Sequence, residues 1–325
     1  MSDPRLCVIG AGALSSRRIY SYVGLAGGQI VGACDLDREK AERNARRFGG
    51  TAYTNFEAML DEQKPDGVII CIGPEQHAKL APAVLRKGFP VYTEKPPAPT
   101  AAATLEVARV AKETGLLCMT AFKKRYAECY ARAKEWIDSF PSEDLYSISL
   151  DYACAQQRHD SLRHSFLLDV AIHAIDLIAY LFGDAQQVFA FAKGLDAYAV
   201  SIRFAHGAVG SMNLNDGRSF KVPTEEVEIS IRGGNFMTIH NSSVWRITEK
   251  EKPCEWREPT TFISSGDSGN DTGHLAELVE FVNAIREKRS TRSAIYESYK
   301  SMALYEAIKK SAETGEVVDV RYETL

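Results

Sequence analysis

The sequence lacks the marks of a membrane protein, an exported protein and a nucleic-acid-binding protein. It has no run of about 18 apolar residues, which excludes a membrane-spanning helix. The first five residues lack the charged-then-apolar layout of a signal peptide, so we expect a cytoplasmic protein. The formal net charge of −4 leaves no positive excess for a polyanion, so we expect no nucleic acid partner.

The sequence also lacks closely spaced cysteine pairs of the kind that bind zinc. The chain has seven cysteines and no Cys-x-x-Cys pair. Cys7, Cys34, Cys71 and Cys118 fall in or beside segments that we expect to be buried strands. We interpret them as small core residues in a reducing compartment, and we expect no structural zinc and no other metal.

What the sequence does contain is a first part in which strands and helices alternate. A length of 325 residues is enough for two domains, each with its own core. The alternation indicates βαβ units in a doubly wound, mostly parallel sheet, and therefore an α/β fold. Strands are expected at 5–10, 29–35, 52–53, 67–72, 91–94 and 116–120, and helices at 13–23, 37–48, 56–62, 77–87 and 101–114.

Local signals mark several ends of these helices. Asn55 and Thr100 are plausible N-caps, because their side-chain oxygens can accept from first-turn N–H groups. Gly49, Gly88 and Gly115 stand just past helical segments, where a left-handed backbone favours glycine.

The regular alternation of strands and helices ends after about residue 123. We expect helices at 127–140 and 165–182, a strand at 144–152, and successive strands from 187 to 249. Residues 250–273 read as a loop, followed by helices at 274–288 and 298–314 and a short strand at 317–320. These patterns predict an open sheet with much antiparallel pairing.

The first strand runs directly into Gly10-Ala11-Gly12 and then into a helix. In a dinucleotide-binding turn the first glycine allows the tight turn and the second lets the pyrophosphate approach the helix N-terminus. The third position of that fingerprint is Gly or Ala, whereas this chain has Ser15, which should keep the helix slightly further from the strand. The alternative is an ordinary strand–helix turn.

Asp35 ends the second strand, at about the 20-residue spacing expected for the acid that binds the cofactor ribose. A carboxylate there repels a 2′-phosphate, so NAD is favoured over NADP, although Arg38 lies close enough to weaken that preference. The alternative for Asp35 is a cap of the helix at 37–48.

Lys95 follows the fifth strand and precedes a proline, which restricts the lysine backbone to an extended conformation. Ligands of doubly wound sheets bind beyond the carboxyl ends of the strands. Lys95 would then project over the nicotinamide and act as a general base with a lowered pKa. The alternative is a salt-bridged surface lysine.

Asp169, His173 and Asp176 share one face of the expected helix at 165–182, whose other faces are apolar. A polar stripe on a buried helix meets a substrate, a metal or internal partners. A metal would need further ligands that the sequence does not identify. His274 is a weaker candidate for a substrate contact, and Lys123–Arg125 is either a solvated charge run or the mouth of a cleft.

These motifs resemble, in order and spacing, the glucose–fructose oxidoreductase, inositol dehydrogenase and MocA (Gfo/Idh/MocA) family. The similarity covers essentially the whole chain. It departs from the usual pattern at Gly73-Pro74-Glu75 and at Arg163–Phe166, both of which would border the substrate. The residues that carry it are Gly10, Gly12, Asp35, Pro74, His77, Glu94, Lys95, Pro96, Asp169, His173 and Asp176.

The resemblance implies a Rossmann domain at 1–122 and a C-terminal α/β domain at 123–325 with a large open, mainly antiparallel sheet. It implies an NAD(P)-dependent oxidoreductase acting on a ring hydroxyl or keto group of a sugar, cyclitol or related polyol, and a homodimer or homotetramer. Lys95 and His173 would transfer the proton and Asp169 would orient the substrate. Expected cofactor contacts are Gly10, Gly12, Ala13, Leu14, Asp35, Pro74, His77, Glu94 and Lys95; expected substrate contacts are Lys95, Arg125, Asp169, His173 and His274.

Two other functions are compatible with the same scaffold. One is a glycosidase that oxidises its sugar transiently and recycles bound NAD. The other is a non-enzymatic regulator that senses the nicotinamide cofactor.

Overall fold

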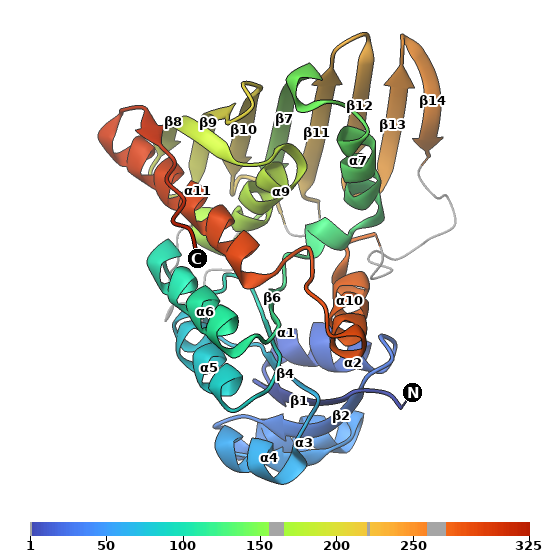
Figure 1. Ribbon diagram of the computed structural model, residues 1–325, viewed down its shortest axis with the longest axis vertical. Coiled ribbons are helices and arrows are strands. Elements are labelled where there is room, and N and C mark those ends of the chain that lie inside the picture. Colours follow the sequence, from blue (N-terminus) through green and yellow to red (C-terminus); the bar gives the residue numbers. More distant parts are fainter. Residues whose placement is uncertain (1, 156–165, 220–221, 259–270) are drawn as a thin grey trace. The chain divides into compact units, whose positions relative to one another are not determined.

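The computed structural model describes residues 2–155, 166–219, 222–258 and 271–325 (Figure 1). The chain forms two compact units. The first comprises residues 1–123, 274–299 and 325, and the second comprises 124–273 and 300–324. The sequence-based division into 1–122 and 123–325 stays a prediction; it places residues 274–299 with the C-terminal part, whereas the first unit contains them.

The first unit is built on a six-stranded parallel sheet in the order β3-β2-β1-β4-β5-β6. Its strands are nearly continuous apolar runs, as burial on both faces requires; in β1, Leu6, Cys7 and Val8 are fully buried. The predicted doubly wound sheet is therefore confirmed. The strands are β1 (Arg5–Ile9), β2 (Gln29–Cys34), β3 (Thr51–Tyr53), β4 (Gly67–Ile70), β5 (Val91–Thr93) and β6 (Cys118–Thr120).

Helices cover this sheet, and one comes from late in the chain. Phe281 of α10 packs its ring 5.5 Å from that of Tyr92 on β5, and a Cβ on Gly67 would lie 2.6 Å from Ile285. This apolar seam explains why α10 belongs to the first unit. The helical segments are α1 (Ala13–Ser15), the π-helix η1 (Ser16–Tyr20), α2 (Ser21–Val23), α3 (Arg38–Phe48), α4 (Phe56–Gln63), α5 (Pro74–Arg86), α6 (Ala101–Thr114) and α10 (His274–Glu287).

The capping signals are confirmed. The Asn55 side chain accepts from the Ala58 N–H at 2.9 Å, and Thr100 Oγ1 accepts from the Ala103 N–H at 3.1 Å. Gly49, Gly88 and Gly115 all have positive φ.

The second unit is built on a nine-stranded sheet in the order β14-β13-β12-β11-β7-β10-β9-β8-β15. Every neighbouring pair is antiparallel except β10 and β7, which confirms the expected open, mainly antiparallel sheet. The strands are β7 (Leu145–Ala153), β8 (Ala185–Lys193), β9 (Ala197–Phe204), β10 (Val209–Asn215), β11 (Thr224–Ile231), β12 (Asn235–His240), β13 (Val244–Glu249), β14 (Lys252–Arg257) and β15 (Val318–Asp319).

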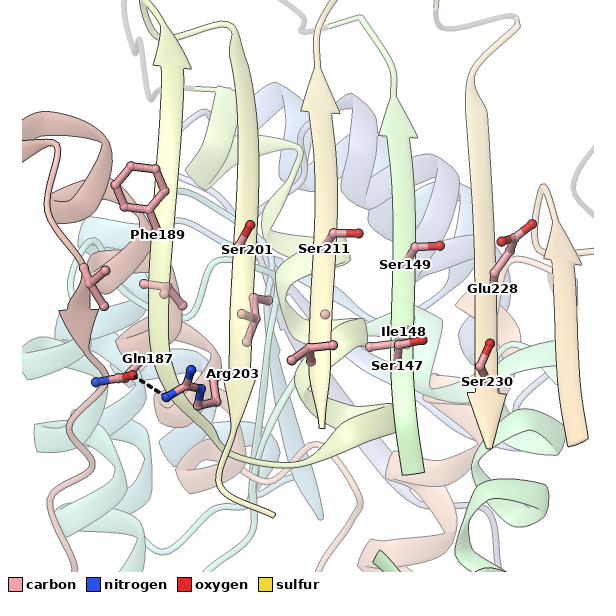
Figure 2. A pocket seen from close by; sticks show the side chains of 15 residues that line it. Ser147, Ile148, Ser149, Gln187, Phe189, Ser201, Arg203, Ser211, Glu228 and Ser230 are labelled. Carbon is pink, nitrogen blue, oxygen red and sulfur yellow. Dashed lines mark hydrogen bonds between the residues drawn. The ribbon is translucent and has the colours of Figure 1, made fainter. Parts of the chain in front are cut away.

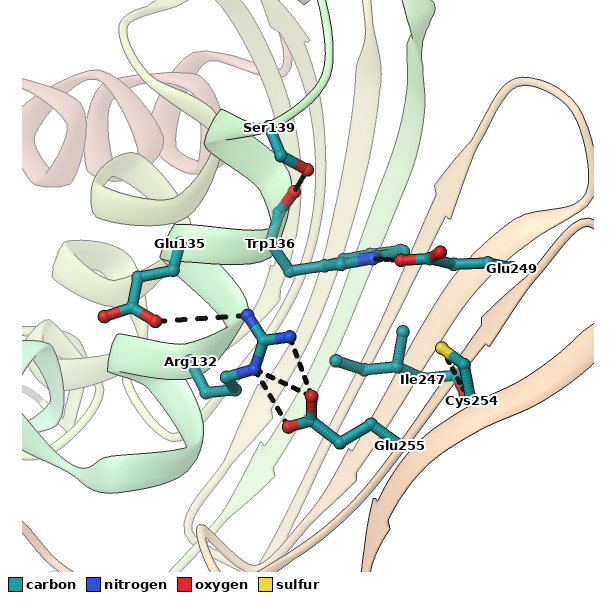
Figure 3. A network of polar contacts seen from close by, with 8 residues as sticks. All are labelled: Arg132, Glu135, Trp136, Ser139, Ile247, Glu249, Cys254 and Glu255. Carbon is teal, nitrogen blue, oxygen red and sulfur yellow. Dashed lines mark hydrogen bonds and ion pairs between the residues drawn. The ribbon is translucent and has the colours of Figure 1, made fainter.

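Helices cover one face of this sheet. α7 (Glu128–Asp138) is fixed to it by two polar contacts, shown in Figure 3. Trp136 Nε1 donates to Glu249 at 2.9 Å, and the Arg132 guanidinium binds Glu255 with both ends of its fork. The other helical segments of the described chain are the 3-10 turns η2 (Lys123–Tyr126) and η3 (Ser142–Asp144), and the helices α8 (Phe166–Asp169), α9 (Ile172–Phe182) and α11 (Ile295–Thr314).

The other face is open and rich in small polar side chains (Figure 2). Ser201, Ser211 and Ser149 lie opposite one another on β9, β10 and β7, flanked by Phe189 and Glu228. A shallow hollow of about 530 Å³ lies along these strands.

Two sequence expectations are wrong. The single helix expected at 165–182 is broken after Asp169, because the N–H of Ala171 bonds to the carbonyl of Phe166 at 2.9 Å and shifts the helical register. The stretch 250–273 is not all loop, since β14 pairs along β13. Pro253 is tolerated there because β14 is an edge strand with a register shift. No helix of the described ranges is long and apolar enough to cross a membrane.

Candidate active site

The turn after β1 has the backbone of a dinucleotide-binding turn. Gly10 has φ +103°, and a Cβ there would lie 2.2 Å from the Cys71 carbonyl oxygen, so only glycine fits. Gly12 is the N-cap of α1 and makes no side-chain cap bond. A Cβ on Gly12 would meet nothing within 4 Å, so the uncapped helix start faces open space. An anionic group fits there.

Ser15 is accommodated by a hydrogen bond. Its hydroxyl is buried and donates to the Gly10 carbonyl at 2.7 Å, which ties the helix to the turn. Directly afterwards the chain enters the π-helix η1. Sequence patterns did not reveal this π segment, a feature that is frequent near functional sites.

Asp35 lies beside the same turn. Its carboxylate accepts from the Ala11 N–H at 2.8 Å and from the Asp37 N–H at 2.9 Å. The cap of α3 is Asp37, whose side chain accepts from Glu39 and Lys40. The interpretation of Asp35 as that cap is therefore wrong, and its position at the strand end fits a ribose contact.

A cationic pocket of about 340 Å³ adjoins the turn. Lys40, Arg43 and Arg47 project from one face of α3. The Arg43 guanidinium also donates to the Ala11 carbonyl at 3.1 Å. Sequence reasoning missed these residues, although basic residues at helical spacing directly after Asp35 were a usable signal. The pocket lining also includes Gly12, Ala13, Ser16 and Asn44.

Three apolar side chains are exposed at the carboxyl ends of the central strands. Leu14 is 48% exposed, Leu36 94% and Ile72 37%. They follow β1, β2 and β4, which neighbour one another in the sheet. Such an edge suits the flat, apolar base of a nucleotide. Together with the uncapped turn and the cationic pocket, it makes this unit fit a dinucleotide.

His77 joins two loops of this edge. The Ile72 N–H donates to its Nε2 at 3.3 Å, so Nδ1 carries the proton and donates to the Pro96 carbonyl at 2.9 Å. Burial lowers the pKa of His77 to about 4, which keeps the ring neutral. Both ring nitrogens thus have protein partners. Pro74 begins α5 after Gly73.

Lys95 belongs to a cluster of ionisable groups beyond β5. The Lys95 N–H donates to the carboxylate of the buried Glu94 at 3.1 Å. Burial raises the pKa of Glu94, and it raises the pKa of Glu277 on α10 well above its usual range. Burial also lowers the pKa of Lys123 to about 8. The bond between Lys95 and Pro96 is cis. Sequence patterns missed Glu277, because α10 lies far from β5 along the chain.

The polar stripe of the second unit divides into two parts. Asp176 is fully buried and accepts a two-pronged bond from Arg125, at 2.9 and 2.8 Å, and a third bond from Ser301 at 2.7 Å. Of the three partners considered for the polar stripe, namely a substrate, a metal or internal side chains, Asp176 has internal side chains. Asp169 ends α8 and His173 lies in the first turn of α9, both half-buried, so the break at 170–171 separates them from a common helix face.

The basic run after β6 is not a solvated charge run. Lys124 pairs with Glu225 and Arg125 with Asp176, and both basic side chains are buried. Tyr130 also donates to Glu225. The two basic residues therefore have carboxylate partners within the second unit. His274 is the first residue of α10 and is half-buried.

The family of NAD-binding Rossmann oxidoreductases known as Gfo/Idh/MocA matches residues 5–122, and the C-terminal α/β domain of the same family matches residues 151–320. D-glucoside 3-dehydrogenase of Escherichia coli K12 is 23% identical and covers 98% of each chain. Inositol 2-dehydrogenase of Acidothermus cellulolyticus is 23% identical over 97% of this chain and 94% of its own.

Solved structures show the same fold. A levoglucosan dehydrogenase in complex with NADH and L-sorbose superposes with a TM-score of 0.84 at 21% identity, covering 99% of this chain and 100% of its own. An oxidoreductase of Agrobacterium radiobacter in complex with NAD+, L-tartaric acid and magnesium gives 0.85 at 16% identity, covering 98% and 99%. The chain therefore belongs to the Gfo/Idh/MocA family and is an NAD(P)-dependent oxidoreductase.

Proposed function

We propose that this enzyme moves a hydride between the nicotinamide cofactor and a ring hydroxyl or keto group of a sugar, cyclitol or related polyol. The proposal rests on one observation, that the expected cofactor-binding residues and the expected general base lie at the same edge of one parallel sheet. The glycine turn, Asp35 and Lys95 follow β1, β2 and β5 at its carboxyl ends. The similarity to a D-glucoside 3-dehydrogenase and to an inositol 2-dehydrogenase supports the substrate class.

Different residues of the first unit would bind the phosphates and the ribose of the cofactor. The first-turn N–H groups after Gly12 and the cations of α3 would bind the cofactor phosphates, and Asp35 would bind the ribose hydroxyls. When bound, NAD supplies the hydride acceptor. His77 holds the loop that carries Lys95 rather than touching the cofactor.

Lys95 is the proposed general base. Its neutral amine removes the proton of the substrate hydroxyl, and its ammonium returns that proton in the reverse direction. Glu94 fixes the lysine backbone by accepting its N–H. We propose His173 as a second proton-transfer group and Asp169 as the orienting carboxylate. His274 remains a proposed substrate contact, and Arg125 is better explained by its pair with Asp176.

We also propose that the enzyme is a cytoplasmic homodimer or homotetramer, with the open face of the nine-stranded sheet as an interface. The rows of serines in Figure 2 line the shallow hollow on this face. Val209 and Phe191, 53% and 67% exposed, add apolar area to it.

The test is a screen of sugars, inositols and their amino derivatives for reduction of NAD and of NADP. We expect NADH from at least one polyol, with NAD preferred. Turnover of a glycoside with retained cofactor and no net NADH would support the glycosidase instead. Cofactor binding without turnover of any compound would support the regulator.

A further inference from the structure

The arginines of α3 fall into two groups that differ in their partners. Arg38 and Arg46 each form an ion pair with Glu42, with a nitrogen-to-oxygen distance of 3.6 Å in both pairs. Arg43 and Arg47 line the cationic pocket beside the glycine turn, and neither has a carboxylate partner among the described residues. The first two guanidinium groups therefore have a compensating charge on their own helix, whereas the second two keep theirs for a ligand.

The cationic pocket has an excess of positive charge. Of the described residues that line it, Lys40, Arg43 and Arg47 are basic and none is acidic. Lys40 forms an ion pair with Asp37 at 3.1 Å, so the two arginines remain without a compensating carboxylate. Guanidinium groups bind phosphate oxygens through paired N–H donors. A hollow of about 340 Å³ with this charge therefore suits a phosphate group.

The pocket lies along the flank of the first helix rather than over its start. Its lining continues from Gly12 and Ala13 to Ser16, about one helical turn further on. The Ser16 hydroxyl lies 2.9 Å from the Gly12 carbonyl oxygen and 3.0 Å from Asn44 Oδ1, and so joins this turn to α3. The N–H groups that would bind the pyrophosphate are at the helix start. A phosphate in the pocket would therefore be a different phosphate of the cofactor.

Arg43 and Asp35 bind the same residue of the glycine turn. The Ala11 N–H donates to the Asp35 carboxylate at 2.8 Å, and the Ala11 carbonyl accepts from the Arg43 guanidinium at 3.1 Å. Asp35 is the expected partner of the cofactor ribose. A phosphate ester on the ribose 2′ oxygen would extend beyond the hydroxyl that Asp35 binds, and a cation stands on the other side of Ala11.

The negative charge of Asp35 is also partly offset. Besides the Ala11 N–H, the carboxylate accepts from the Asp37 N–H at 2.9 Å. Two N–H dipoles directed at one carboxylate stabilise its charge and weaken its repulsion of a nearby phosphate.

We propose that Arg43, assisted by Arg47, forms a subsite for the 2′-phosphate of NADP, so that the enzyme accepts both NAD and NADP although Asp35 is present. Arg43 is then a specificity-determining residue, because it contacts the one group that distinguishes the two cofactors. This inference rests on the proposed function for the place of the cofactor beside the glycine turn.

The test is calorimetric titration of the enzyme, without substrate, with NADH and with NADPH, which differ only in the 2′-phosphate. We expect NADPH to bind no more than about tenfold more weakly than NADH, because Arg43 offsets the repulsion by Asp35. NADPH that binds about 100-fold more weakly, or not at all, while NADH binds overturns this inference alone. Binding of neither cofactor overturns the proposed function.

Variants assign the effect to the arginine. Arg43→Met should weaken NADPH binding about tenfold or more and leave the Kd for NADH within about threefold of wild type. Arg43→Lys keeps the charge and should restore part of the NADPH affinity. Arg46→Met is the matched control on the same helix and should change neither Kd, since Arg46 pairs with Glu42.

A structural role of Arg43 would give a different result. If the guanidinium only held the turn through the Ala11 carbonyl, Arg43→Met would weaken NADH and NADPH equally, and this contradicts the proposal. Unchanged NADPH affinity in that variant contradicts it as well. If Arg43→Met does not fold, Arg47→Met and the wild-type ratio of the two Kd values decide, and Arg47→Met should weaken NADPH binding selectively.

Discussion

The ring of His77 connects two loops of the cofactor edge, with Nδ1 2.9 Å from the Pro96 carbonyl oxygen and Nε2 accepting from the Ile72 N–H. His77→Leu would leave both backbone groups without a partner, at about 1–3 kcal/mol each. We expect lower stability in urea and a fall in kcat, because the loop after β5 carries Lys95. His240→Leu, at an exposed histidine, is the control and should stay within about 0.5 kcal/mol of wild type.

The same ring makes stability depend on pH. The pKa of His77 is about 4 in the folded chain, below the ordinary 6.5. Below pH 6.5 the unfolded chain therefore binds more protons, and the folded state loses stability as pH falls towards 4, by about 3 kcal/mol at most. Since the buried Glu94 and Glu277 act in the opposite direction, the measurement is the difference between wild type and His77→Gln. A difference that stays constant between pH 7 and 4 would contradict the assignment.

The buried pair of Arg125 and Asp176 should behave as a structural unit. Asp176→Leu strands a buried guanidinium and should cost about 3–5 kcal/mol, and Arg125→Met should be similarly damaging. The double variant Arg125→Met with Asp176→Leu should recover much of the loss. Full stability in either single variant would mean that the pair is not buried in solution.

Asp35 should control the choice of cofactor. Asp35→Ser removes the charge that repels a 2′-phosphate and leaves the cations of α3 in place. The ratio of kcat/KM for NADP to that for NAD should rise about 100-fold, or about 3 kcal/mol. The matched variant Asp37→Ser changes only the cap of α3 and should leave the ratio unchanged. An equal rise in both variants would remove the special role of Asp35.

Sequence patterns predicted those parts of the fold that depend on neighbouring residues. Asn55 and Thr100 cap their helices through N–H groups a few positions away, so their role can be read locally. The same holds for Gly10, whose positive φ is required by the turn that it begins. The strand–helix alternation was enough to predict the parallel sheet.

The features that sequence patterns did not predict depend on contacts between segments that are far apart in the chain. Arg125 and Asp176 are 51 residues apart, and Lys124 and Glu225 are 101 apart, so no spacing rule pairs them. The helix is interrupted after Asp169 although no glycine or proline stands there, so the sequence does not predict the break. Of the predicted departure from the family pattern at Arg163–Phe166, residues 163–165 lie outside the described part of the chain.

The central claim is that Lys95 transfers the substrate proton and does not hold the cofactor. The decisive measurement pairs steady-state kinetics with the Kd for NADH in Lys95→Ala, with Lys79→Ala as the control for an exposed lysine. We predict that kcat falls by about 10²–10⁴ while the Kd for NADH changes less than about threefold. A kcat within threefold of wild type would contradict the account.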